Sequence, residues 1–167
     1  MRAMLSWCCL LATVGTAIAG RALPGVPDAC SLLSKEEVEA AVRRTVLTPK
    51  REPILNISNC LYGDPQAPPD KLEPTPIVSV SVFVGGMEER FPGFPKEAKD
   101  TFEMMKKFAT TPRPIAALGD DAYWENSRRE LVILRGKYMI AIKLQPNSGD
   151  QPAAKVLAAK VLERLPR

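Results

Sequence analysis

The sequence contains no histidine among its 167 residues. Histidine is the side chain that titrates near neutral pH, and it serves as the general base of Ser-His-Asp and Cys-His arrangements and as a common zinc ligand. Its absence removes these catalytic arrangements and most zinc sites. Carboxylates, serine with lysine, and tyrosine remain as side chains for catalysis.

Long apolar runs and runs of one charge sign are absent after the first twenty residues. No later stretch approaches the roughly 18–20 apolar residues of a membrane-spanning helix. Acidic and basic residues are mixed along the chain, and the formal net charge is only +4. Nucleic-acid binding usually needs a concentrated basic face. We therefore expect no transmembrane segment after signal removal, no nucleic-acid partner, and no cofactor or metal.

The first 19 residues have the pattern of an export signal. Arg2 gives a positive start, a mostly apolar stretch follows from Met4 to Val14, and Ala17-Ile18-Ala19 is a small-x-small cleavage site. The pattern predicts cleavage between Ala19 and Gly20 and a periplasmic or secreted mature chain. Residues 20–30 then form an extended lead-in, and residues 31–167 are long enough for one globular domain with its own core.

Two of the four cysteines, Cys8 and Cys9, would leave with the signal. Cys30 and Cys60 remain as an even pair in a compartment where thiols oxidise, which predicts a structural disulfide. A redox-active pair is the alternative, but such pairs more often have Cys-x-x-Cys spacing at a helix start.

Apolar periodicity and turn residues predict the order α-β-β-α-β-β-β-α. The first helix begins at Ser34, whose spacing from Glu37 is that of a capping box, and ends before Pro49. The later helices are expected at 96–109 and 152–165, and the strands at 54–62, 77–84, 122–125, 130–135 and 138–144. Because helices and strands do not alternate strictly, we expect an α+β fold. It would have an antiparallel sheet of about five strands with three helices packed mainly on one face.

The helix predicted over 96–109 has a candidate buried stripe. Its apolar residues Ala98, Phe102, Met105 and Phe108 recur at steps of three and four. Such spacing is typical of the core-facing side of an amphipathic helix. We therefore expect these four side chains to face the sheet.

Four short stretches together resemble a known family. They are Asp28-Ala29-Cys30-Ser31-Leu32-Leu33-Ser34 with Glu36-Glu37-Val38, Ser58-Asn59-Cys60-Leu61-Tyr62, Leu118-Gly119-Asp120-Asp121-Ala122-Tyr123-Trp124, and Leu131-Val132-Ile133-Leu134-Arg135-Gly136. The chain resembles the DUF3558 family of uncharacterised exported proteins, which are often lipoproteins. The resemblance implies an α+β envelope domain with a Cys30–Cys60 disulfide and no catalytic residues. This chain differs in lacking a lipidation cysteine at the cleavage site.

Asp120 and Asp121 are adjacent carboxylates that precede two aromatic residues. Such a pair is able to bind a cation or share a proton. The alternative is ordinary turn chemistry after Gly119, followed by a half-buried strand.

The aromatic residues Phe91, Phe94, Tyr123 and Trp124 have two interpretations as well. They line a ligand groove or a partner surface, or they belong to the core. Together with the two aspartates, they make up the candidate binding surface.

These observations favour a non-enzymatic exported domain that binds a protein or an envelope component. One alternative is a carrier of a small ligand in an apolar pocket between the sheet and the helices. The other is a carboxylate-based hydrolase or transferase that uses Asp120 and Asp121 with a lysine or tyrosine.

Overall fold

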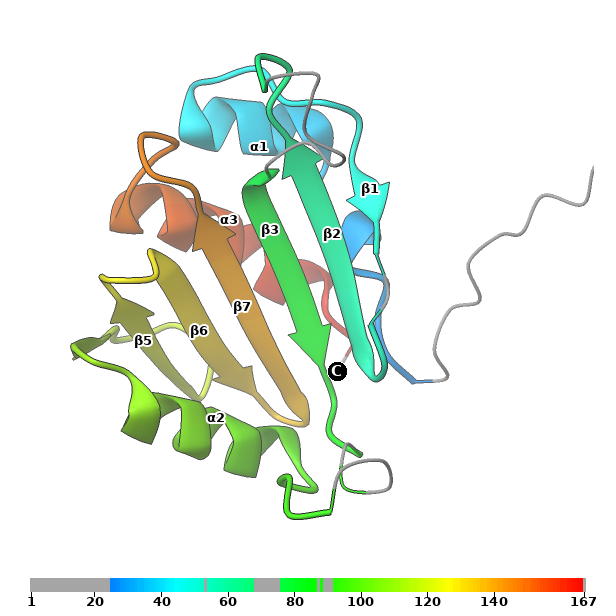
Figure 1. Ribbon diagram of the computed structural model, residues 1–167, viewed down its shortest axis with the longest axis vertical. Coiled ribbons are helices and arrows are strands. Elements are labelled where there is room, and N and C mark those ends of the chain that lie inside the picture. Colours follow the sequence, from blue (N-terminus) through cyan, green and yellow to red (C-terminus); the bar gives the residue numbers. More distant parts are fainter. Residues whose placement is uncertain (1–24, 53, 68–75, 87, 89–91, 167) are drawn as a thin grey trace, which may run out of the picture.

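The computed structural model describes residues 25–52, 54–67, 76–86, 88 and 92–166. Over these residues the chain is an α+β domain with a seven-stranded antiparallel sheet and three α-helices (Figure 1). The predicted export signal, the first residues of the lead-in and Phe91 lie outside the described residues.

The elements follow the predicted order, with two short strands and one 3-10 helix in addition. They are η1 (Ala29–Ser31), α1 (Lys35–Val42), β1 (Lys50–Arg51), β2 (Ile57–Gly63), β3 (Pro76–Phe83), α2 (Ala98–Phe108), β4 (Pro112–Pro114), β5 (Asp121–Glu125), β6 (Glu130–Arg135), β7 (Tyr138–Leu144) and α3 (Gln151–Arg164). The strand order in the sheet is β1-β2-β3-β7-β6-β5-β4.

The expectation of about five strands was wrong because it missed the two edges of the sheet. β1 has two residues and β4 has three, so neither is long enough to show an apolar alternation. β4 also contains Pro112 and Pro114, which are typical of loops in a sequence but are tolerated at a sheet edge. Short, charged or proline-containing strands are poor templates for a further strand.

Local sequence signals account for the starts of α1 and α3. The Ser34 hydroxyl accepts a hydrogen bond from the Glu37 amide, and the Glu37 carboxylate accepts one from the Ser34 amide, so the capping box is confirmed. α3 has Asp150 as its N-cap and Pro152 in its first turn, which suits proline because the amides there lack helical partners.

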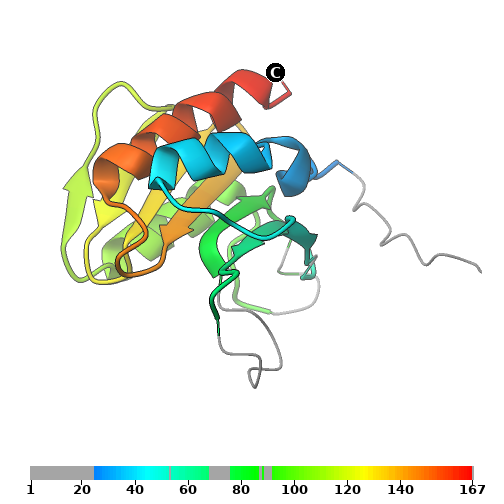
Figure 2. The ribbon, with the colours of Figure 1, turned by 90° about the horizontal axis from the view of Figure 1, so that it is seen from above.

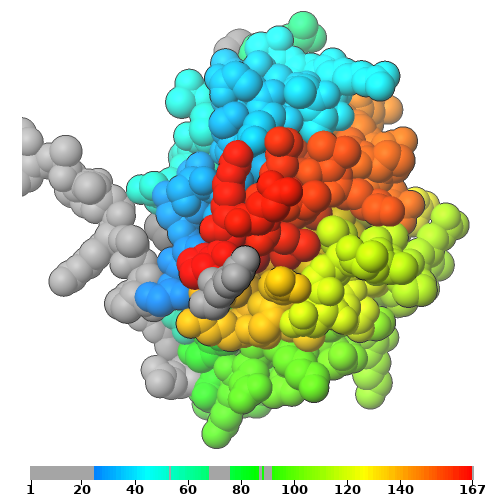
Figure 3. Space-filling view, turned by 180° about the vertical axis from the view of Figure 1, so that it is seen from behind, coloured from blue at the N-terminus to red at the C-terminus, as the bar shows by residue number. Residues whose placement is uncertain are grey.

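The helices cover both faces of the sheet. α1 and α3 lie side by side on one face, here called the back face, and α2 lies on the opposite, front face (Figures 1, 2 and 3). The back cluster includes Val38, Leu157 and the β3 valines, whereas Phe102 of α2 packs in a separate cluster on the front. The expected placement on one face therefore holds for two of the three helices.

The predicted stripe of α2 is correct for Ala98 and Phe102 but wrong for Phe108. Ala98 and Phe102 are buried and Met105 is partly buried, but Phe108 is 73% exposed. Each step of three residues turns about 60° short of a full helical turn. Two such steps from Phe102 therefore carry Phe108 about 120° away from the buried side.

The disulfide prediction is confirmed. Cys30 in η1 and Cys60 in β2 are bonded, with their Cα atoms 4.9 Å apart. Two hydrogen bonds support the same junction, from the Ala29 amide to Ser58 Oγ at 2.9 Å and from the Tyr62 hydroxyl to the Leu33 carbonyl at 2.8 Å. The segment before α1 is thereby fixed to the back face of the sheet.

Candidate functional site

Asp120 and Asp121 have separate partners and serve separate contacts. Asp120 Oδ2 accepts a hydrogen bond from the Gly136 amide at 2.6 Å, which braces the turn between β6 and β7. Asp121 Oδ2 lies 2.7 Å from Nζ of Lys106, which ties β5 to α2. The fold thus directs the two adjacent carboxylates to different elements.

The neighbouring aromatic residues are divided between the two cores. Tyr123 and Trp124 are 1% and 3% exposed, and successive residues of β5 point to opposite faces. Tyr123 packs against Phe102 on the front, with ring centroids 5.4 Å apart, whereas Trp124 belongs to the back cluster. Phe94 is 46% exposed in the segment before α2. Tyr123 and Trp124 are therefore core residues and do not contribute to one exposed surface.

The backbone at Gly119, directly before the two aspartates, requires a glycine. Its φ is +69°, and a Cβ at this position would lie 2.4 Å from the carbonyl oxygen of Leu134. The next amide, that of Asp120, donates to the same carbonyl at 2.8 Å. The Gly-Asp-Asp stretch therefore brings the start of β5 close to the end of β6.

The front face has an open part that sequence reasoning did not identify. α2 packs on β6 and β7, and none of the helices among the described residues lies over the front of β2 and β3 (Figure 1). The strand register places five front-facing residues in a row from β2 to β5: Leu61, Ser79, Lys143, Glu130 and Glu125. Lys143 is exposed, and Leu61 and Ser79 are partly exposed.

A hollow of about 700 Å³ lies on this open part. We call it the front hollow; it is lined by Glu52, Leu61, Pro76, Ser79 and residues 127–129 and 143–146. Three of these residues, Arg128, Arg129 and Lys143, carry a positive charge. The acidic residue Glu52 already lies 3.6 Å from Nζ of Lys50.

Backbone hydrogen bonds fix the walls of the front hollow. The Leu144 amide donates to the Arg129 carbonyl at 2.9 Å, and the Gln145 amide donates to the Ile77 carbonyl at 2.9 Å. Arg129 Nη2 also donates to the carbonyl of Gly149. The turn between β5 and β6 is thus held against the segment that follows β7.

Two carboxylates stand beside the front hollow without lining it. Burial opposes ionisation of Glu125, but hydrogen bonds from the Ser127 hydroxyl and amide and from the Thr111 amide outweigh it and lower its pKa. Burial raises the pKa of Glu130, although Lys143 and Arg128 oppose that rise. Hydrogen bonds from the protein therefore favour the ionised form of Glu125, whereas Glu130 ionises less readily.

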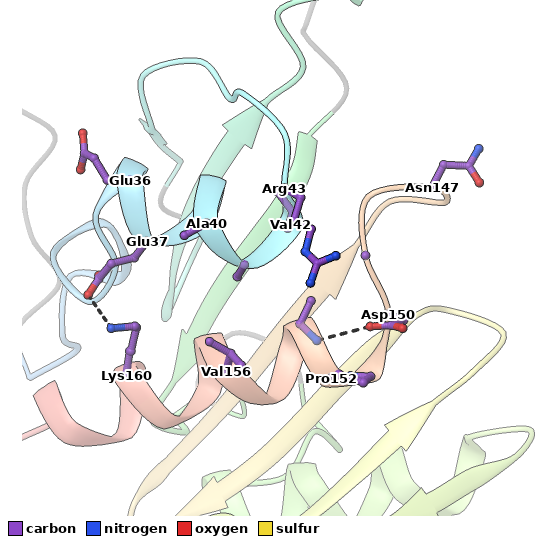
Figure 4. A pocket seen from close by; sticks show the side chains of 13 residues that line it. Glu36, Glu37, Ala40, Val42, Arg43, Asn147, Asp150, Pro152, Val156 and Lys160 are labelled. Atoms are coloured by element: carbon purple, nitrogen blue, oxygen red, sulfur yellow. Dashed lines mark hydrogen bonds and ion pairs between the residues drawn. The ribbon is translucent and has the colours of Figure 1, made fainter.

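A second hollow, of about 850 Å³, lies between α1 and the first half of α3 (Figure 4). Three of its charged side chains, Glu37, Lys160 and Asp150, have structural partners. Glu37 is bonded to Lys160, and Asp150 caps α3 through the Ala153 amide. The rest of its lining includes Ala40 and Val156, and Val156 is 52% exposed. This groove therefore combines apolar surface and engaged charged groups with the exposed residues Glu36 and Arg43.

A third hollow, of about 1090 Å³, lies where the turn between β6 and β7 meets the end of α3. It includes Asp120, but the carboxylate of that residue accepts the Gly136 amide and lies 3.7 Å from Arg135. The aspartate thus has a bracing role at this hollow.

Residue alternation gave part of the signal for the front hollow, because Ser79 and Ser81 interrupt the valines of β3 and Lys143 interrupts the apolar run of β7. Alternation assigns a residue to one of two faces, but it does not say which strands are neighbours. The meeting of Ser79 with Lys143 depends on the pairing of β3 with β7, across more than fifty residues of intervening chain.

Among the described residues, no cluster of three or more potential metal ligands occurs, and no helix has the length and apolar character of a membrane span.

Comparison with known proteins adds no functional assignment. No protein-family model matches the chain, and no curated protein is significantly similar to it. The resemblance to DUF3558 therefore remains a prediction.

Proposed function

We propose that the mature protein is an exported, non-enzymatic domain that binds an envelope component through the front hollow. The predicted signal and the Cys30–Cys60 disulfide support export, because disulfides persist mainly in oxidising compartments. The disulfide also fixes η1 to the sheet on the back face, away from the proposed binding surface.

The front hollow is the observation that carries this proposal. Its volume of about 700 Å³ is within the roughly 300–1,000 Å³ typical of ligand pockets. It combines apolar walls, such as Leu61 and Leu144, with polar groups from four separate segments. Its walls are joined by backbone hydrogen bonds, so little ordering should be needed on binding.

The carrier alternative shares this support in part. The front hollow is large enough for a small ligand, but it opens on the sheet surface instead of lying between the sheet and a helix. The hydrolase alternative has weaker support, because Asp120 and Asp121 are engaged by different elements. Binding of an envelope component is therefore the function that we put forward.

The test uses the mature, disulfide-bonded chain immobilised and exposed to solubilised envelope from its producing cells. Ser79→Trp places a large side chain in the front hollow, and Ala40→Trp places the same side chain in the α1–α3 groove as a matched control. We expect Ser79→Trp to lose the retained component, measured by mass spectrometry of the eluate, and Ala40→Trp to keep it. Equal retention by the wild type and Ser79→Trp would refute the proposal, provided that circular dichroism shows both to be folded.

A further inference from the structure

The front hollow has more positive side chains than its own fold uses. The side chains of Arg128 and Lys143 are exposed and form no hydrogen bond or salt bridge with another residue in the described part of the chain. They approach from different segments: Arg128 from the turn between β5 and β6, and Lys143 from the end of β7. Two cations from different segments are thus available to a group bound in the hollow.

The nearby acids do not take up these donors. Glu52 pairs with Lys50, and the buried Glu125 carboxylate is bonded to Ser127 and Thr111. Glu130 is the front-facing neighbour of Lys143 in the sheet, and within the described residues it forms no salt bridge with it. Arg128 and Lys143 therefore interact with Glu130 only at a distance, and among the described residues no carboxylate forms an ion pair with either side chain.

Arg129 adds a second observation at the same place. It lines the hollow, and its Nε is buried without an acceptor among the described residues. A buried donor of a charged group without an acceptor is costly, and an oxygen in the hollow, from water or a ligand, would relieve that cost. The hydrogen bond of its Nη2 to Gly149 meanwhile keeps the side chain in position.

From these contacts we infer that the front hollow binds an anionic oxygen group, a carboxylate or a phosphate, between Arg128 and Lys143. A guanidinium matches the two oxygens of either group in a bidentate geometry, and an ammonium acts as a point charge beside it. The hydroxyl of Ser79 lines the same hollow and offers a further donor. This inference rests on the proposed function and names the chemistry that the envelope component would present.

The direct test is an NMR titration of the mature, disulfide-bonded chain with inorganic phosphate and, separately, with succinate, at constant ionic strength. We expect saturable shifts of the amides of residues 127–129 and 143–145. Saturation with phosphate alone identifies a phosphate group, saturation with succinate alone identifies a carboxylate, and saturation with both supports the shared chemistry. Shifts that stay linear with both anions, or that lie elsewhere on the chain, would overturn the inference.

Substitutions of opposite sign sharpen the test. Arg128→Ala and Lys143→Ala should each weaken anion binding about tenfold, the loss expected for one charge-assisted hydrogen bond. Glu130→Gln should strengthen it severalfold, because it removes a negative neighbour of Lys143. Lys99→Ala, at an exposed position of α2 outside the hollow, is the control and should leave the affinity unchanged. Unchanged affinity in the Arg128→Ala, Lys143→Ala double variant would contradict the inference.

The same double variant separates this inference from the proposed function. If Ser79→Trp loses the envelope component and the double variant retains it, the hollow is the binding site but the anion inference fails. If Ser79→Trp retains the component, the proposed function fails, and the anion titration is then judged by itself.

Discussion

The carboxylate of Glu37 in α1 and the guanidinium of Arg164 in α3 form two parallel hydrogen bonds, each 2.7 Å long. Glu37 also accepts from Lys160 and from the Ser34 amide, and Arg164 donates to the Leu32 carbonyl. One carboxylate thus caps the first helix of the domain and joins it to the last. The ends of the folded chain are connected on the back face, opposite the front hollow.

The pH dependence of stability should reflect this contact. Hydrogen bonds from Arg164 and the Ser34 amide, opposed by burial, lower the pKa of Glu37 from 4.5 to about 2. Because the folded-state pKa is lowered, the stabilisation is present above about pH 4.5 and is lost as the pH falls towards 2. Allowing for solvent screening, Glu37→Gln should cost about 1 kcal/mol at pH 7 and little at pH 2.

Urea denaturation at pH 7, 4 and 2 measures this difference. Glu103→Gln, an exposed acid of α2, is the control and should change the unfolding free energy little at any of these values. A constant deficit of Glu37→Gln across the whole range would show that the ion pair is not the cause.

The disulfide should stabilise the domain because it closes a loop in the unfolded chain and so lowers the entropy of the unfolded state. Cys30 and Cys60 are 30 residues apart, and the chain-entropy model assigns roughly 3–4 kcal/mol to such a loop. We expect reduction to lower the unfolding free energy by about that amount. Denaturation with and without a reductant measures it, and labelling of free thiols in the unreduced protein checks the pairing. Two reactive thiols in protein taken from its native compartment would weaken the argument for export.

Gly119 should be far less replaceable than Gly136. Both have positive φ, but a Cβ at Gly136 meets no atom within 4 Å, whereas a Cβ at Gly119 meets the Leu134 carbonyl oxygen at 2.4 Å. Gly136→Ala should cost about 1 kcal/mol from the left-handed backbone alone. Gly119→Ala should cost at least about 1–3 kcal/mol more, because a well-packed strand must move. Equal midpoints of thermal unfolding in the two variants would contradict this account.

Substitution of the two phenylalanines of α2 should change the free energy of unfolding by very different amounts. Phe102 is fully buried against Tyr123, so Phe102→Ala should cost about 3–5 kcal/mol. Phe108 is 73% exposed, and Phe108→Ser should change stability by less than about 0.5 kcal/mol. A large loss for Phe108→Ser, measured by chemical denaturation, would mean that this side chain is covered in solution.

The signal is testable by intact mass of the protein recovered from its producing cells. We expect a mature chain that begins at Gly20, because Ala17 and Ala19 provide the small residues that signal peptidase requires. Ala19→Leu should block this cleavage and leave a heavier product. An unprocessed wild-type chain would contradict the predicted signal.

Local patterns were sufficient for the longer elements. The capping box of Ser34 and Glu37 marks the start of α1, and the valine alternation marks β3. The Arg135-Gly136-Lys137 turn separates β6 from β7 at the expected residues. These signals are readable because each depends on residues within a few positions of one another. β1 and β4 were missed because strands of two or three residues exist only through their pairing with a neighbour.

The candidate site was less predictable for the same reason. Adjacent Asp120 and Asp121 looked like one site, but their partners, Gly136 and Lys106, come from opposite directions in the chain. Tyr123 and Trp124 looked like one surface, but strand geometry sends them into two cores. Sequence proximity is a poor guide here because a strand divides neighbouring side chains between its two faces.

By itself the sequence determined the cysteine pair, the α+β class, the principal helices and strands, and the exclusion of histidine chemistry. These follow from composition, periodicity and short-range hydrogen bonding. Only the tertiary structure decided that α2 covers the front face, that Glu37 meets Arg164, and that Arg128, Lys143 and Ser79 line one hollow. Those relations depend on strand order and register, which are set by the packing of the whole core and not by any single segment.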